Sequence, residues 1–119
     1  MTYEDDVTLT AVAQELYETA ASKGFHDIDN SRSLVDNMAV WVANLHGEVS
    51  ELWECVRRDK ANNKCDKDCD LTNMEEEFAD IVIRAFDSAT AAGINIGKAV
   101  RLKAAYNATR PHMHGGKLR

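Results

Sequence analysis

Apolar residues recur at steps of three and four along the first half of the chain, which is the spacing of one face of an α-helix. The first such segment covers residues 7 to about 22, and Gly24 follows where a helix would stop. The polar residues 24–33 predict a loop, and a second helix is expected from about 33 to about 59. Its apolar face comprises Leu34, Met38, Val42, Leu45, Val49, Leu52 and Val56.

A polar segment separates this helix from the next one. Residues 60–74 are rich in Asn, Asp and Lys, which predicts a connecting loop. Thr72 or Asn73 is the expected N-cap of a third helix, which runs from about 74 to 92 and ends at Gly93. Its apolar positions are Phe78, Ile81, Val82, Ala85, Phe86 and Ala89. They cover more than half of the helix, so we expect this helix to be central.

A fourth helix is expected from residue 96 to about 109, capped by Asn95 and ended by Pro111. The sequence of 119 residues contains one Pro and six Gly against many Ala, Leu, Glu and Lys, and this composition favours helices over strands. We therefore predict a single all-α domain over residues 1–119 with a bundle-like arrangement of four helices. The third helix is very apolar for so short a chain, and it leaves surface that a partner subunit would cover. We therefore also predict a homodimer or a homotetramer.

The net charge of −6 argues against a nucleic-acid polymer as partner. The sequence shows neither an apolar run long enough for a membrane span nor a signal-peptide pattern, so we expect a cytoplasmic protein without a membrane partner. In that compartment Cys55, Cys65 and Cys69 are expected to be free thiols. Trp41 and Trp53 are expected to belong mainly to the core.

Two pairs of carboxylates carry the candidate chemistry. Glu48 and Glu51 lie three residues apart on the second helix, as do Glu77 and Asp80 on the third. Residues at this spacing share one helix face. Four carboxylates facing one another offer only oxygen ligands, which favour Mg²⁺ or Mn²⁺. These four acids are the predicted metal ligands and catalytic residues.

Other interpretations of the acids and cysteines stay open at this stage. Each acidic pair alone is also typical of a solvated helix face. The cysteines at 65 and 69 are spaced for half of a zinc site, but no second pair follows. Four acids also match positions of a calcium-binding EF-hand loop, although Leu71 replaces its glycine. These four acids are Asp66, Asp68, Asp70 and Glu77.

Polar residues on the last helix suit phosphate oxygens. Lys103, Asn107 and Arg110 follow one another at steps of four and three, which places them on one line. Arg84 lies on the acidic stripe of the third helix, and Asn44 lies on the flank of Glu48. Lys117, after two glycines, adds a donor from the tail. The predicted substrate-binding set is Lys103, Asn107, Arg110, Arg84, Asn44 and Lys117.

Three runs together resemble the MazG-like nucleotide pyrophosphohydrolases of the all-α NTP pyrophosphatase superfamily. They are LHGEVSEL at 45–52, EEFADIVIR at 76–84, and the Lys, Asn and Arg line that ends at Pro111. The family is marked by E-x-x-E, a spacer and E-x-x-D. The segments 23–25 and 114–117 also resemble small members, so the similarity extends from about residue 10 to 117.

The resemblance implies an oligomeric four-helix fold that uses Mg²⁺, with Mn²⁺ as a substitute. It implies cleavage of a nucleoside triphosphate between the α and β phosphates, which gives a monophosphate and pyrophosphate. Glu48, Glu51, Glu77 and Asp80 then correspond to the metal ligands. Alternatives are a module that senses a nucleotide without cleaving it, or a member that acts on a phosphoribosyl nucleotide or on one pyrimidine triphosphate. The sequence departs from the family in the long spacer 60–74.

Overall fold

The computed structural model describes residues 6–111, and in this part it is all-α. The elements are α1 (Asp6–Ser22), a 3₁₀ turn η2 (Asp29–Ser31), α2 (Leu34–Arg57), α3 (Asn73–Ala91) and α4 (Ile96–Ala108). Each helix boundary lies within one turn of the expected position. The prediction of four helices in an all-α chain is therefore confirmed for the described residues.

Side-chain caps explain why three of the helices begin where they do. The Ser33 side chain accepts a hydrogen bond from the Asp36 amide at the start of α2. Thr72 and Glu75 form a capping box at the start of α3, in which each side chain accepts from the other residue's backbone amide. Asn95 caps α4 in the same way as Ser33 caps α2. These bonds satisfy amide groups that the first turn of a helix leaves without a partner.

Two glycines end helices as expected. Gly24 after α1 has φ +88° and Gly93 after α3 has φ +80°, a conformation that side-chain-bearing residues rarely adopt. After Gly24 the chain turns back, and the Phe25 amide donates to the Ala20 carbonyl. The turn directs residues 25–33 toward α3, where they help to build the site described below.

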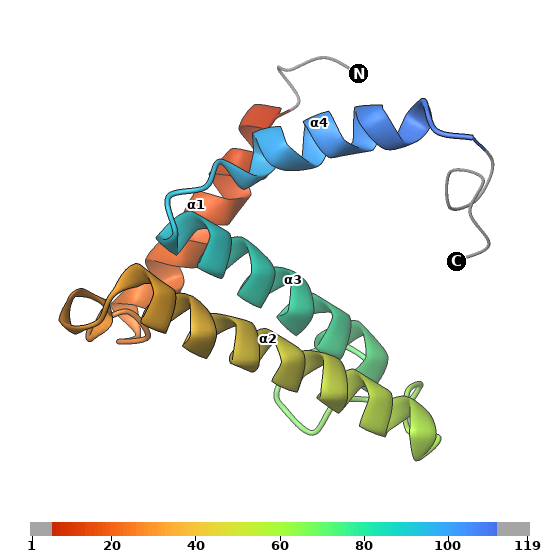
Figure 1. Cartoon of the computed structure of the whole chain (residues 1–119). Helices are drawn as coiled ribbons and strands as arrows, with labels where there is room; N and C mark the ends of the chain where they lie inside the picture. Colours follow the sequence, from red (N-terminus) through yellow and green to blue (C-terminus); the bar gives the residue numbers. More distant parts are fainter. Residues whose placement is uncertain (1–5, 112–119) are drawn as a thin grey trace.

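The helices pack around α3, as the sequence predicted for this helix. α2 and α3 run side by side in opposite directions, and α1 packs against α3 (Figure 1). α4 packs mainly on α1, and its second half extends away from α2 and α3 (Figure 1). Within the described part, no helix is both long enough and apolar enough to cross a membrane.

The core of the single chain is small. Only three apolar side chains in the described part are buried, namely Ala13, Trp41 and Cys65. Trp41 is a core residue as expected, but Trp53 is 60% exposed, so that prediction is wrong for Trp53. The other described helices therefore leave the Trp53 side of α2 largely uncovered.

The loop between α2 and α3 folds back on itself. The Cys65 amide donates to the Leu71 carbonyl at 2.9 Å, and an isolated antiparallel bridge forms between Lys64 and Thr72. This fold brings Cys65 and Cys69 together, and a disulfide joins them. The expectation of free thiols is therefore wrong for these two cysteines and confirmed for Cys55.

Candidate metal centre

The antiparallel packing of α2 on α3 brings the two predicted acidic pairs together. Carboxylate oxygens of Glu48, Glu51 and Glu77 lie within 4.8 Å of one another. Carboxylate oxygens of Glu77, Asp80 and Glu76 form a second group of the same size. Glu77 belongs to both groups and therefore lies at the centre. We call these five residues the acidic cluster.

Like charges perturb the titration of the acidic cluster. Burial, followed by the negative charges of Glu51 and Asp80, raises the pKa of Glu77 to about 7. The neighbouring Glu48 carboxyl raises the pKa of Glu51. Burial, followed by the charges of Glu48 and Glu76, raises the pKa of Asp80. All three shifts favour the protonated acid, which indicates that nearby cations do not balance the negative charge of the cluster.

Two cations of the chain neutralise part of the cluster. The Arg84 guanidinium donates to Glu48 at 3.1 Å, and the Lys67 ammonium pairs with Glu76. Glu77 Oε2 is buried, and it has no hydrogen-bond partner among the described residues. A buried carboxylate oxygen without a donor is costly.

These residues fit a hard divalent cation. The unsatisfied oxygen of Glu77 and an all-oxygen donor set match Mg²⁺ or Mn²⁺ better than zinc. Glu48, Glu51, Glu77 and Asp80 would hold such an ion. The EF-hand alternative finds no support within the described residues, because the Asp66 side chain is 94% exposed and joins no metal-binding group. The disulfide likewise removes the thiols that a zinc site needs.

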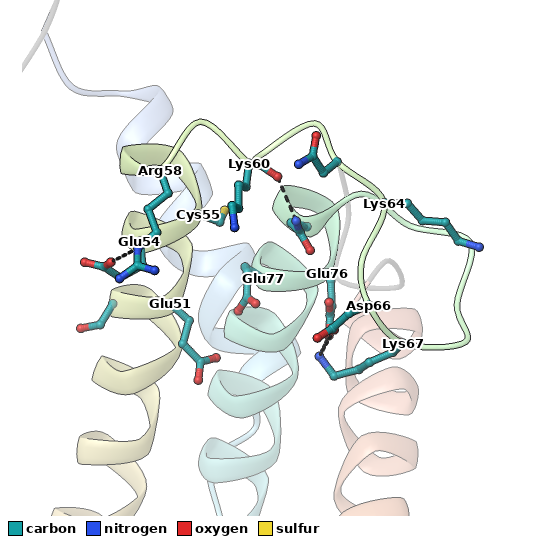
Figure 2. Close-up of a pocket in the computed structure, with 13 residues that line it drawn as sticks. Glu51, Glu54, Cys55, Arg58, Lys60, Lys64, Asp66, Lys67, Glu76 and Glu77 are labelled. Carbon is teal, nitrogen blue, oxygen red and sulfur yellow. Dashed lines mark hydrogen bonds and ion pairs between the residues drawn. The ribbon is translucent and has the colours of Figure 1, made fainter.

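A polar cavity lies on one side of the acidic cluster. It has a volume of about 700 Å³ and is lined by both acids and cations of α2, α3 and the connecting loop (Figure 2). Glu51, Glu76 and Glu77 contribute the acidic wall. The cationic residues that line the cavity are Arg58, Lys60, Lys64 and Lys67. We call this space the loop cavity.

A second cavity, of about 370 Å³, lies between α1 and α3 on the other side of the acids. Glu48 and Asp80 reach it from the acidic cluster. Its remaining wall combines charged with apolar side chains. The charged residues are Lys23, Arg84 and Asp87, and the apolar ones are Leu16, Ala20, Phe25 and Ile83. Because Glu48 approaches Glu51 and Glu77, the acidic cluster connects a polar cavity with a more apolar one. We call the second space the α1 cavity.

A buried histidine lies close to the α1 cavity. His26 Nδ1 lies 2.5 Å from Asp29 and Nε2 lies 2.7 Å from Asp87. The ring packs against Tyr17 and Trp41. Burial alone lowers the pKa of His26, but its hydrogen bonds to Asp87 and Asp29 outweigh burial and raise it. This trio, the His26 clamp, ties the 24–33 loop to α3.

The predicted substrate-binding residues fall into two groups. Arg84 contacts Glu48, and Asn44 lines a small cavity next to Arg84, so both lie near the cluster. Lys103, Asn107 and Arg110 lie on the part of α4 that extends away, and they line neither cavity (Figure 1). Lys103 and Arg110 instead approach the Tyr106 ring. Lys117 lies outside the described residues.

Sequence reasoning missed three residues of this region. Glu76 belongs to the acidic cluster, and its spacing of four from Asp80 could have indicated a shared face. Lys67 comes from an irregular loop, where no periodicity tells which way a side chain points. The partner of His26 on α3 is 61 residues away, and no local pattern reports such a contact.

Comparisons with known proteins do not assign a family. No family model matches the chain, and no curated protein or solved structure matches it either. Function therefore has to be inferred from the acidic cluster and the two cavities that it joins.

Proposed function

We propose that this protein is a Mg²⁺-dependent nucleoside triphosphate pyrophosphohydrolase of the MazG-like type. It cleaves a ribo- or deoxyribonucleoside triphosphate between the α and β phosphates and releases a monophosphate and pyrophosphate. The observation that carries this proposal is the acidic cluster, in which the buried Glu77 Oε2 lacks a donor beside a cavity lined by cations. The sequence similarity of residues 45–52 and 76–84 supports the same activity.

The cluster residues have separable tasks in such a reaction. A bound Mg²⁺ supplies charge neutralisation of the phosphates and a more acidic bound water. Glu48, Glu51, Glu77 and Asp80 bind and orient that ion, and a carboxylate oxygen that does not bind it accepts the proton of the attacking water. Arg84 is held by Glu48 beside the Phe25 ring, at the boundary between the cluster and the α1 cavity. From there its remaining donors can bind a phosphate oxygen.

The direct test is pyrophosphate release from a panel of ribo- and deoxyribonucleoside triphosphates with Mg²⁺. The proposal expects release from at least one nucleotide and loss of release with excess EDTA. The alternative, a module that senses a nucleotide on the same fold, expects binding with no pyrophosphate. The ranking within the panel tests the further alternative of one preferred pyrimidine triphosphate, and a phosphoribosyl nucleotide belongs in the same panel.

We also propose that the protein acts as a homodimer or a homotetramer. The exposed side of α2 carries valines at intervals of seven, and Val42, Val49 and Val56 are each close to half exposed. Met38, Leu45 and Leu52 lie between them, which completes the a and d positions of a heptad pattern. A second copy of this chain packed on α2 would cover this apolar face.

Light scattering at micromolar concentration tests the assembly. The wild-type protein is expected to have the mass of two or four chains. The double variant Val42→Glu/Val49→Glu is expected to form an assembly of fewer chains and so to have a smaller mass. Ala43→Glu is the matched control, because it adds a charge to the same helix outside the heptad positions. A monomeric wild-type protein with full activity would contradict the proposal. Assembly is also the route by which Lys103, Asn107 and Arg110 of one protomer could reach the acids of another.

A further inference from the structure

The loop that joins α2 and α3 is tied firmly to the start of α3. The Asn73 amide donates to the Asn63 carbonyl at 2.7 Å, and the Met74 amide donates to the Ala61 carbonyl at 3.0 Å. The Asn73 side chain adds a hydrogen bond to the Lys60 carbonyl at 2.9 Å. These bonds fix the loop next to the acidic cluster. Its side chains are therefore presented to the loop cavity at defined positions.

Two of the four cations that line the loop cavity face its acidic wall. Lys67 extends from the loop to Glu76, and Lys60 points from the loop toward the space between α2 and α3 (Figure 2). Lys64 points away from this space, and Arg58 is paired with Glu54 at 3.0 Å (Figure 2). Lys60 has no ion-pair partner among the described residues. Lys60 and Lys67 are therefore the cations best placed to meet an anion held at the cluster.

We propose that Lys60 and Lys67 bind the terminal phosphates of the substrate, which leave as pyrophosphate, inside the loop cavity. This inference rests on the proposed function. It assigns the phosphate site to the connecting loop of the same chain, in addition to the residues expected on α4.

The two cavities determine the direction of the substrate. A nucleoside triphosphate has a highly charged end and a more apolar end. The loop cavity is lined by four cations and by no aromatic side chain, whereas the α1 cavity combines two cations, Lys23 and Arg84, with an apolar wall that includes Phe25. The terminal phosphates therefore match the loop cavity and the nucleoside matches the apolar wall of the α1 cavity, with Arg84 and the acids at the scissile region between them.

The charges predict that this site needs a divalent cation. The acidic wall of the loop cavity repels a polyphosphate, and Lys67 is already paired with Glu76. A cation on the carboxylates reduces that repulsion, and the Lys67 side chain, which is 66% exposed, can then turn to a phosphate oxygen. The contact with Glu76 also raises the pKa of Lys67, so its positive charge is kept in the resting state.

Calorimetric titration of the full chain with inorganic pyrophosphate tests the assignment, with and without Mg²⁺. Lys60→Gln and Lys67→Gln are each expected to weaken Mg²⁺-dependent pyrophosphate binding roughly tenfold, and the double variant about a hundredfold. Lys67→Arg keeps the charge and is expected to stay within a few-fold of wild type. Lys98→Gln, an exposed lysine on α4, is the matched control.

A nucleoside monophosphate serves as the second probe, because it lacks the phosphates that the loop is proposed to bind. Its affinity is expected to be unchanged in both lysine variants, which a general loss of structure would not allow. Unchanged pyrophosphate binding in the double variant, or no Mg²⁺-dependent binding by the wild type, would overturn the inference even if the protein hydrolyses nucleotides. Lysine-dependent pyrophosphate binding without hydrolysis of any nucleotide would instead overturn the proposed function and keep the anion site.

Discussion

The His26 clamp and the acidic cluster both bring carboxylates from separate elements against α3, but only in the clamp does every carboxylate meet an imidazole or guanidinium group. In the clamp, each ring nitrogen of His26 meets one carboxylate, and Arg32 adds a contact to Asp29 at 3.5 Å. In the acidic cluster, five carboxylates share the contacts of Arg84 and Lys67. One buried oxygen of Glu77 has no partner among the described residues.

The pKa shifts express the same difference. The pKa of His26 is raised by its carboxylate partners, so the clamp favours the charged imidazolium. The pKa values of Glu51, Glu77 and Asp80 are also raised, but for an acid this favours the neutral form. The protein's own groups therefore balance the clamp, whereas the cluster needs a cation from outside. A difference of this kind separates a structural ion network from a candidate site.

The largest effect is expected from changing the centre of the cluster. Glu77→Gln keeps the shape of the side chain and removes one charge and one metal ligand. Turnover should fall about a hundredfold or more, which corresponds to roughly 3 kcal/mol of transition-state stabilisation. The melting temperature without metal should hold or rise slightly, because a like-charged neighbour is gone. Steady-state kinetics and thermal melting of the metal-free protein measure the two effects.

Glu75→Gln is the control for this prediction. Glu75 lies on the same helix, and glutamine can also complete the capping box. Equal loss of activity in Glu75→Gln and Glu77→Gln would show that the cluster has been assigned wrongly. Glu51→Gln should behave like Glu77→Gln.

Metal addition should stabilise the protein through the cluster and not through the clamp. An ion that binds only the folded state at a hundred times its Kd adds about 2.7 kcal/mol to the free energy of unfolding. Mg²⁺ or Mn²⁺ should therefore raise the melting temperature of the wild type, and much less that of Glu77→Gln. Activity should disappear in excess EDTA and should not require zinc. Full activity under EDTA would refute the metal assignment.

The sequence was a good guide to what is local in this structure. Helix boundaries followed from apolar spacing and from caps such as Ser33, Thr72 and Asn95, because both depend on residues within one turn. The pairing of Glu48 with Glu51 likewise follows from helix geometry. The two acidic helices were also expected to face each other. On each of them the acids lie next to the apolar residues that pack against the rest of the chain.

Contacts between distant or irregular segments could not be read in the same way. Periodicity shows that Val42 and Val49 share an apolar face, but not whether the chain itself covers that face. The direction of α4 depends on its packing against α1, so the distance between Lys103 and the acids could not be predicted. His26 and Lys67 lie in irregular segments, and their partners on α3 follow only from the tertiary fold.

The His26 clamp should make stability depend on pH. Because its folded-state pKa is raised, His26 contributes stability that is fully present below the unfolded value of about 6.5 and is lost as pH rises through the folded value. Asp29→Asn removes one of its partners and should cost on the order of 2 kcal/mol at low pH. The cost should shrink as pH rises through the folded-state pKa of His26, because above it the imidazole is neutral in both proteins. Urea unfolding across this range, with turnover as a second measurement, should show the stability change at nearly normal activity.

The smallest effect is expected from the disulfide loop. Replacing Cys65 and Cys69 together by Ser should leave turnover within a few-fold of wild type. Backbone hydrogen bonds, such as Cys65 to Leu71 and Asn73 to Asn63, hold the loop without the sulfur atoms. Lys67 then keeps its reach to the acidic cluster. Steady-state kinetics of the double variant, and of the wild type with and without a thiol reductant, measure the effect. A loss of turnover as large as that of Glu77→Gln would contradict this prediction. It would mean that the cysteines position the site, and that α2 and α3 alone do not hold the acidic cluster in its active arrangement.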